Sequence, residues 1–377
     1  MMGCNRILKT VVRSLPATVV ALGIFGSCIE PPLHLPEESP EVELELQVQI
    51  DVNVDYDAEW FYGWDDKDKE LFGELNYVEP TTFQLRRYFT GDEAYASHQN
   101  VLYDVVKGNT YRAQYAWGFW DLLVWNELTT IDGIQSLRFD EETSLDYVTA
   151  STGQTMNSTR YQAPKYTRSF YQPEQLYSAY MQGLEINKNL DGFTYDAERK
   201  VYVKKINLKL LPLTYIYLTQ VIIHHNNGKI TGVDGNGNLS GMARTVNMNT
   251  GVAGSDAVTV HYYVRFKTGC DMKGESVDIA GGRLVTFGMC NMEASRTDAP
   301  SDDEVRHYMD VDFQFNNGTD STFVFDVTDQ VRKKYHGGVL TIELDADTLK
   351  MPTRAGGSGF DAVVKDFEDG GTHEFEM

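Results

Sequence analysis

The sequence predicts an all-β protein built from two β-sandwich domains in tandem with a few short helices. Three observations carry this prediction: apolar and polar residues alternate over long stretches, Gly, Asn and Asp turn signals separate those stretches, and helical periodicity is rare. A length of 377 residues suits two domains better than one. Hydrophobic residues form 42% of the chain, which is enough to fill two packed cores.

Residues 1–27 have the pattern of a secretory signal peptide. Three basic residues and no acidic ones accompany an apolar run of about a dozen residues, and small residues stand directly before Cys28. The run is shorter than the ~20 residues of a membrane-spanning helix. Small residues before a cysteine are typical of a bacterial lipobox, so we expect Cys28 to be acylated and to become the N-terminus. An ordinary signal peptide with an incidental Cys28 is the alternative.

Residues 28–40 read as a proline-rich tether, because Pro31, Pro32 and Pro36 prevent a helix and favour extended chain. Three acyl chains bury many more CH₂ groups than one myristoyl chain, at ~0.8 kcal/mol each, so we expect stable anchoring in a membrane. Removal of residues 1–27 takes away three basic residues and no acidic ones, which changes the formal charge from −22 to −25.

The first expected strand is residues 42–54, in which apolar and polar residues alternate without error. The same period recurs over residues 258–266, 323–327 and 340–344. Within residues 201–210 the alternation changes phase at two consecutive lysines, which predicts a β-bulge.

Asn227-Gly228 predicts a type I′ turn and a hairpin between the segments on either side of it. We expect short helices in residues 65–75, in residues 173–181, where a proline stands at the start, and in residues 328–335.

The polar stretch before residue 200 suggests a junction, so we expect an N-terminal β-sandwich over residues 41–197 and a C-terminal β-sandwich over residues 198–377. The acidity argues against a nucleic-acid partner, because phosphates would be repelled. Charge is uneven: residues 35–79 hold fifteen acids and two bases, whereas residues 160–209 hold nine bases and five acids. A solvated acidic face explains the first segment without any function.

No catalytic motif stands out, and we expect no enzymatic activity, no cofactor and no metal site. His224 and His225 are adjacent in a predicted strand, so their side chains should point to opposite faces and should not bind one ion together. Fifty-five acidic residues allow many carboxylate pairs, so their presence carries no weight for hydrolysis.

Two further features are candidate site residues. Cys270 and Cys290 could form a disulfide or remain buried thiols, and the sequence leaves both open. An aromatic cluster reads as core packing, with Trp120 on the opposite face as the best candidate for an exposed glycan contact; its other members are Tyr115, Trp117, Phe119 and Trp125.

Short motifs beyond Cys28 resemble those of the fimbrillin and Mfa-like lipoproteins of Bacteroidales, in particular a branch of Bacteroides lipoproteins. The motifs concentrate in residues 213–290. They are Gly232-Val233-Asp234-Gly235, Leu239-Ser240-Gly241-Met242-Ala243, Val246-Asn247-Met248-Asn249-Thr250-Gly251 and Thr286-Phe287-Gly288, with Pro31-Pro32-Leu33-His34-Leu35 after the lipobox.

The resemblance implies two transthyretin-like sandwiches, a place in type V pili or related surface adhesins, and no enzymatic activity. In that group an Arg/Lys-directed protease removes the first strand of shaft pilins, whereas anchor subunits keep their lipid. Here the first basic residue after Cys28 is Lys67. We therefore expect a fimbrial anchor or accessory adhesin that keeps its first strand, with the outer membrane and fimbrial subunits or surface ligands as partners.

Two other functions remain open at this point. A surface glycan-binding lipoprotein would use exposed aromatic side chains such as Trp120. A secreted hydrolase would need convergent carboxylates or a triad in a cleft, and no residue of the sequence is nominated for either.

Overall fold

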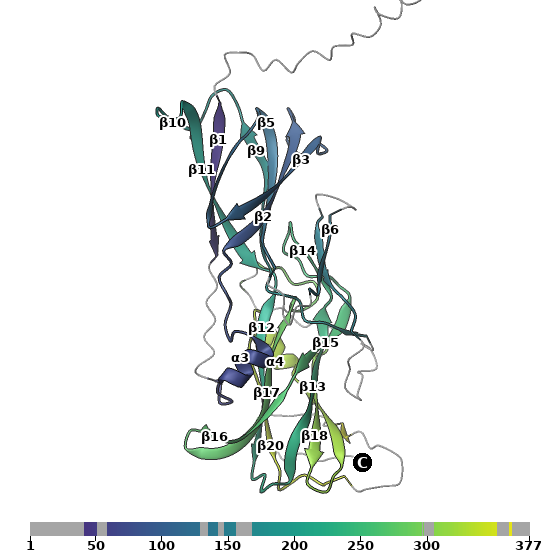
Figure 1. The fold of residues 1–377 in the computed structure, drawn as a ribbon. Coiled ribbons are helices and arrows are strands. Elements are labelled where there is room, and N and C mark those ends of the chain that lie inside the picture. The colour runs from purple at the N-terminus through teal and green to yellow at the C-terminus, as the bar shows by residue number, and fades with distance from the viewer. Residues whose placement is uncertain are drawn as a thin grey trace, which may run out of the picture.

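The computed structural model describes residues 41–50, 59–128, 135–141, 147–155, 168–295, 297, 305–352 and 362–363. It is a mostly β protein in two halves arranged end to end (Figure 1). No helix within these ranges is both long and apolar enough to span a bilayer.

The first half is a single eight-stranded sheet with the order β3-β2-β5-β9-β11-β1-β4 and with β10 attached to β11. β3 and β4 stand at its two ends but are joined by residues 108–109, so the sheet curls into a nearly closed barrel. Its strands are β1 (Val42–Ile50), β2 (Thr82–Gly91), β3 (Asn100–Lys107), β4 (Thr110–Gln114), β5 (Gly118–Asn126), β9 (Tyr177–Ile186), β10 (Thr194–Asp196) and β11 (Val201–Pro212).

The second half is a sandwich of two sheets, and the largest hydrophobic cluster of the described residues fills it and continues to Leu123 and Trp125 of the first half. One sheet has the order β16-β17-β12-β20 and the other β21-β19-β18-β13-β15-β8. The strands are β8 (Ser169–Phe170), β12 (Tyr215–His224), β13 (Ile230–Ala243), β15 (Ala257–Tyr263), β16 (Arg265–Met272), β17 (Glu275–Thr286), β18 (Tyr308–Phe315), β19 (Asp320–Asp326), β20 (Gly338–Asp345) and β21 (Ala362–Val363).

A small third unit ties the halves together. β6 (Leu137–Asp140) and β7 (Thr149–Thr152) come from the first half of the sequence, and β7 pairs with β14 (Thr245–Asn247). β8 likewise adds to the second sandwich beside β15. The expected division at residue 198 therefore does not separate the sheets, because β11 belongs to the first barrel and earlier strands pair with the second half.

Two expected helices are present, as α3 (Asp66–Phe72) and α4 (Thr328–Lys333). The third was wrong: residues 177–186 form strand β9, which pairs with β5 across nearly its whole length. The segment's apolar residues fit either period over so short a stretch, and pairing in the barrel decides for the strand.

The turn at Asn227 and Gly228 has the positive φ values of 46° and 75° that a type I′ turn requires. The hairpin was nevertheless wrong, because β12 and β13 pair into different sheets and the turn joins the two layers of the sandwich. The expected strand over residues 258–266 is divided at Val264 into the end of β15 and the start of β16.

The expected β-bulge in β11 was also wrong. β11 runs beside β1 from Val42–Tyr202 to Ile50–Leu210 without a shift of register. Val203 is paired with Glu43 and so lies on that glutamate's face, whereas Leu208 shares the core face with Val48. The change of phase in the sequence thus marks a change in which face of a regular strand is covered.

Candidate functional site

β1 is an interior strand of the first barrel. It pairs in parallel with β11 along its whole described length and antiparallel with β4 over Glu43–Gln47. One face of β1 is packed into the barrel core, where each side chain is at most 5% exposed; these residues are Val42, Leu44, Leu46 and Val48. Removal of β1 would open both the core and two ladders of backbone hydrogen bonds.

The opposite face of β1 carries two glutamates that are only 5% exposed, Glu43 and Glu45. Arg199 donates two hydrogen bonds to the Glu43 carboxylate, at 2.6 and 2.8 Å. Arg112 donates to Glu45 and holds the pKa of that carboxyl below its usual range, and Lys205 Nζ lies 3.4 Å from it. Acidic residues of the N-terminal segment are thus neutralised by basic residues of β4 and of the stretch around β10 and β11.

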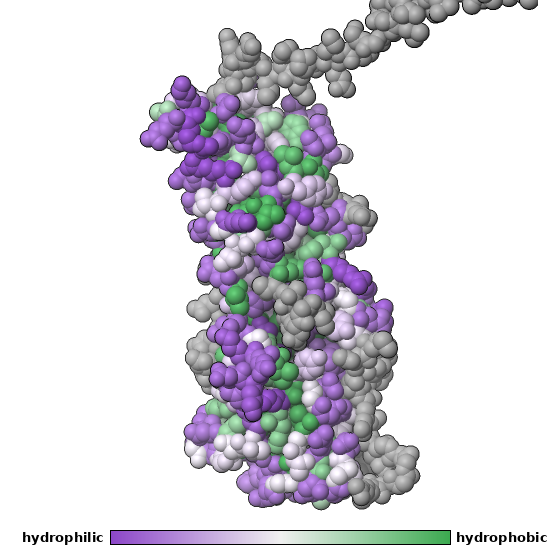
Figure 2. All heavy atoms as spheres, in the orientation of Figure 1, coloured by the Kyte–Doolittle hydropathy of each residue, from purple (hydrophilic) through white to green (hydrophobic). Residues whose placement is uncertain are grey.

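That basic stretch is visible at the surface as a hydrophilic corner over β10 and β11 (Figure 2). The uneven charge of the sequence therefore has a structural role here, in addition to solvation, because the two segments of opposite charge are neighbours in one sheet.

Residues 59–77, which we call the strap, lie against the outer face of the second sandwich and lead back to the barrel at β2 (Figure 1). Tyr62 is buried against Ile222 and Ile279, and Trp60 and Tyr77 pack against the neighbouring apolar cluster of β12 and β17. Gly281 permits this approach, since a Cβ there would lie 2.8 Å from the Tyr62 ring.

Hydrogen bonds fasten both ends of the strap. The side-chain amide of Gln220, on β12, accepts from the Phe61 amide at 3.0 Å and donates to the Glu59 carbonyl at 2.6 Å. At the other end the Tyr77 hydroxyl donates to the Thr214 carbonyl at 3.2 Å. Gln220 is fully buried, so these bonds satisfy a polar group that would otherwise be costly.

Helix α3 lies within the strap and begins with a capping box. The Asp65 carboxylate accepts from the Asp68 amide, and the Asp68 carboxylate accepts from the Asp65 amide, both at 2.9 Å. The reciprocal bonds fix the first turn of a helix that is only seven residues long.

Asp68 is also fully buried and anchors α3 to the sandwich. Its carboxylate accepts from Arg265 Nη1 at 2.7 Å, from Lys267 Nζ at 2.5 Å and from the Tyr62 hydroxyl at 2.8 Å. Asp65 contacts the same two basic side chains, and the hydrogen bond from Arg265 holds the pKa of Asp65 well below its usual range. We call Asp65, Asp68, Arg265 and Lys267 the clamp.

Lys67 and Lys69, the first basic residues after Cys28, are exposed on α3. Lys69 Nζ forms an ion pair with Glu74 at 2.7 Å. A protease binds its substrate as an extended segment of several residues. Cleavage at either lysine therefore requires α3 to unwind and the clamp to release. The surface of α3 is hydrophilic and accessible, but its backbone is helical (Figure 2).

Cys28 lies outside the described residues, so its acylation stays a prediction. Cys270 and Cys290 do not bridge: Cys270 is opposite Val277 in the β16–β17 ladder, and Cys290 lies beyond the end of β17 at Thr286. Nine strand residues span about 30 Å, far beyond the ~7 Å that a disulfide tolerates between Cα atoms.

Trp120 is not exposed, so the expected glycan contact at this residue was wrong. Its side chain is 4% exposed, packs against Phe89 and Tyr115 with ring centroids 5.0 Å apart, and donates from Nε1 to the Ala116 carbonyl at 3.0 Å. The curled barrel buries this face of β5 as well as the other, which local alternation could not reveal.

A cavity of about 240 Å³ lies where β9 and β11 diverge above the loop at residues 248–251. None of the residues that line it is an Asp, Glu, His or Cys. This cavity therefore supplies no carboxylate pair.

No protein-family model matches the chain, and no curated protein matches it. Among solved structures, a candidate adhesin from Bacteroides ovatus matches with a TM-score of 0.45 and 15% identity, covering 83% of this chain and 95% of its own. A candidate adhesin from Bacteroides thetaiotaomicron matches with a TM-score of 0.42 and 11% identity, over 82% and 93% of the two chains. The fimbrial anchor protein Mfa2 from Porphyromonas gingivalis matches with a TM-score of 0.35 and 12% identity, over 81% and 90%.

Proposed function

We propose that this protein is a lipid-anchored surface protein of the outer membrane that serves as a fimbrial anchor or accessory adhesin and keeps its first strand. The observation that carries the proposal is the position of β1, which is paired on both sides within the barrel. Ion pairs cover its outer face, and the first basic residues that follow it lie in a clamped helix. Such a strand suits a subunit that is retained at the membrane.

The lipid attached to Cys28 would hold the barrel close to the membrane. β1 begins at Val42, fourteen residues after Cys28, and an extended proline-rich chain of that length reaches about 40 Å. β1 starts at the end of the barrel remote from the second sandwich (Figure 1). The second sandwich would therefore project away from the membrane, toward subunits or surface ligands.

Both halves would act as transthyretin-like units that bind other proteins through their strand edges. β3 is a terminal strand of the first sheet, and it exposes large apolar side chains: Leu102 is 37% exposed, Val105 52% and Tyr103 63%. An edge strand of this kind offers backbone groups and apolar contacts to an added strand. The glycan-binding alternative loses its main support with the burial of Trp120.

Acyl labelling with fractionation of the outer membrane tests the proposal. The unaltered protein should carry label and sediment with the outer membrane, whereas a Cys28→Ala variant should lose both. A Cys270→Ala variant is the matched control, since Cys270 lies in the folded sandwich and should leave labelling unchanged. Label that persists in the Cys28→Ala variant would contradict the lipid anchor.

A further inference from the structure

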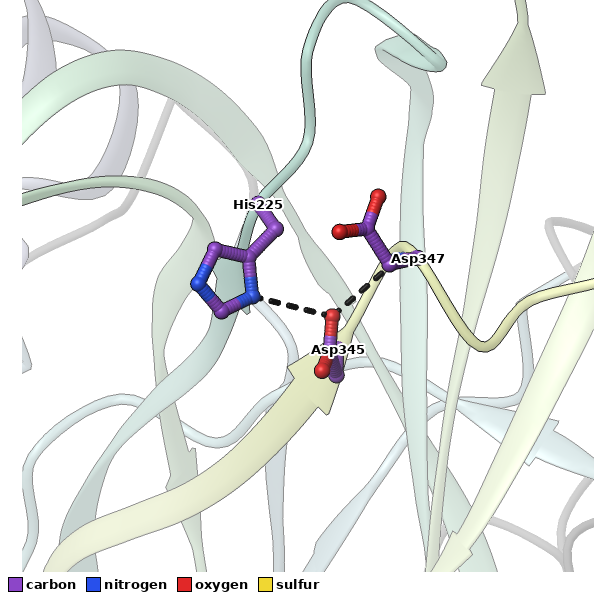
Figure 3. Close-up of side chains that lie close together, drawn as sticks. All are labelled: His225, Asp345 and Asp347. Atoms are coloured by element: carbon purple, nitrogen blue, oxygen red, sulfur yellow. Dashed lines mark hydrogen bonds and ion pairs between the residues drawn. The ribbon is translucent and has the colours of Figure 1, made fainter.

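One end of the second sandwich brings together a histidine and two aspartates from separate segments (Figure 3). His225 follows β12, Asp345 is the last residue of β20, and Asp347 lies two residues further on. His225 Nδ1 is 3.2 Å from an Asp345 carboxylate oxygen. One ligand atom from each of the three residues lies within 4.8 Å of the others.

The two segments are held against each other by backbone contacts. The Ala346 amide donates to the His224 carbonyl at 2.9 Å. Lys229 Nζ donates to the carbonyls of Ala346 and Leu349, each at 2.6 Å. The backbone around the histidine and the aspartates is therefore fixed, and only their side chains need to adjust to a ligand.

Negative charge surrounds this histidine. The hydrogen bond that His225 donates to the Asp345 carboxylate, with smaller contributions from Asp347 and Glu275, raises the pKa of His225 above its usual value. The pKa of Asp345 is lowered, mainly by the hydrogen bond it accepts from the Asp347 amide and then by His225. The site thus stabilises a positive charge between these groups.

We propose that His225, Asp345 and Asp347 bind a zinc ion. Bonds of about 2.0–2.2 Å to nitrogen and oxygen place tetrahedral ligands ~3.3 Å apart, close to the present separation of His225 Nδ1 and Asp345. Asp347 is exposed and can turn toward that position, and water would complete the coordination. An imidazole ligand favours zinc over magnesium and calcium, which prefer oxygen alone.

His224 is adjacent but belongs to a different pair. Its Nδ1 lies 2.9 Å from Glu275, and its ring centroid is 6.3 Å from that of His225. In this arrangement His224 points toward Glu275 and does not reach the proposed ion. It lies among the same acidic residues as His225. It is therefore the matched control residue.

Zinc titration by calorimetry of the purified full-length protein at pH 7.5 tests the proposal. We expect one site per chain, a loss of affinity of at least tenfold in His225→Ala and in Asp345→Asn, and less than a twofold change in His224→Ala. Circular dichroism of each variant checks that it is folded. Absence of a zinc site, unchanged affinity in folded His225→Ala, or an equal loss in His224→Ala would each overturn the assignment.

The pH dependence supplies a second readout. The groups that face His225 or its neighbours are Asp345, Asp347, Glu275, Glu343, His224 and Lys229. Protons compete with zinc for the imidazole nitrogen, so affinity should fall as the pH drops from 7.5 to 5.5. Affinity that stays constant between pH 7.5 and 5.5 would show that His225 is not a ligand.

Discussion

Asp68 is the residue on which attachment of the strap to the second sandwich depends most. It is fully buried, and it accepts hydrogen bonds from Tyr62, Arg265 and Lys267. Arg265 and Lys267 form ion pairs with both Asp68 and the more exposed Asp65. Without the Asp68 carboxylate, only the single negative charge of Asp65 remains to balance these two positive charges.

An Asp68→Asn substitution should therefore lower the free energy of unfolding by about 3 kcal/mol, toward the lower end for a broken buried pair because Asp65 remains. Glu70→Gln, an exposed change in the same helix, should alter it by less than about 0.5 kcal/mol. Urea denaturation followed by fluorescence measures both. Equal stability of the two variants would show that the clamp does not hold the strap.

Trp120 packs in the barrel core against Phe89 and Tyr115 and is only 4% exposed. A Trp120→Ala variant should lose about 4 kcal/mol of stability, because a large ring is removed from a packed site. Tyr103→Ala, at an exposed position, should lose less than about 1 kcal/mol. A Trp120→Ala variant of unchanged stability would reopen the case for an exposed contact.

At the scale of elements, β1 shows how far local pattern reaches. The alternation from Val42 to Ile50 predicted both the strand and its core face correctly, since the period of two depends only on the strand's own residues. Its neighbours could not be predicted, because pairing with β4 and β11 joins residues far apart in sequence. The sequence showed that one segment is acidic and another basic. Only the sheet shows that these segments are neighbours and form ion pairs.

Leu44, in the middle of β1, measures the contribution of this strand. A Leu44→Ala substitution should cost about 3 kcal/mol, because the side chain is fully buried in the barrel core. Gln49→Ala, at an exposed position of the same strand, should cost less than about 0.5 kcal/mol. Equal midpoints of the two variants in chemical denaturation would mean that β1 is not integral to the barrel.

Errors in the sequence predictions have a common physical origin. β9 follows a proline and carries a short apolar pattern that suits a helix, yet β5 provides its hydrogen-bond partners. Asn227 and Gly228 adopt the expected turn, but the turn joins two layers. In each case the local conformation was predictable or ambiguous, and long-range pairing decided the outcome.

At the scale of the whole molecule, the two halves are interleaved. The strap covers the outer face of the second sandwich and leads back to the barrel, while β7 and β8 pair with strands of the second half. The sequence predicted two sandwiches but placed one boundary at residue 198. It did not predict that β7 and β8, which precede this boundary, pair with strands that follow it.

Interleaving predicts that the protein unfolds as one cooperative unit. Differential scanning calorimetry should give a single transition with a ratio of calorimetric to van't Hoff enthalpy near one, because opening either half breaks contacts of the other. In the Asp68→Asn variant the transition should broaden or divide. Two separate transitions in the unaltered protein would show that the halves fold independently.

The central claim is that the protein keeps β1, and digestion of intact cells with trypsin tests it most directly. We predict that the lipid-bearing protein resists cleavage after Lys67 and Lys69, because both lie in α3 and the clamp opposes its unwinding. Asp68→Asn should accelerate cleavage there, by up to ~100-fold if local opening limits the rate. Prompt release from unaltered cells of a lipid-free protein beginning at Asp68 or Glu70 would contradict the account.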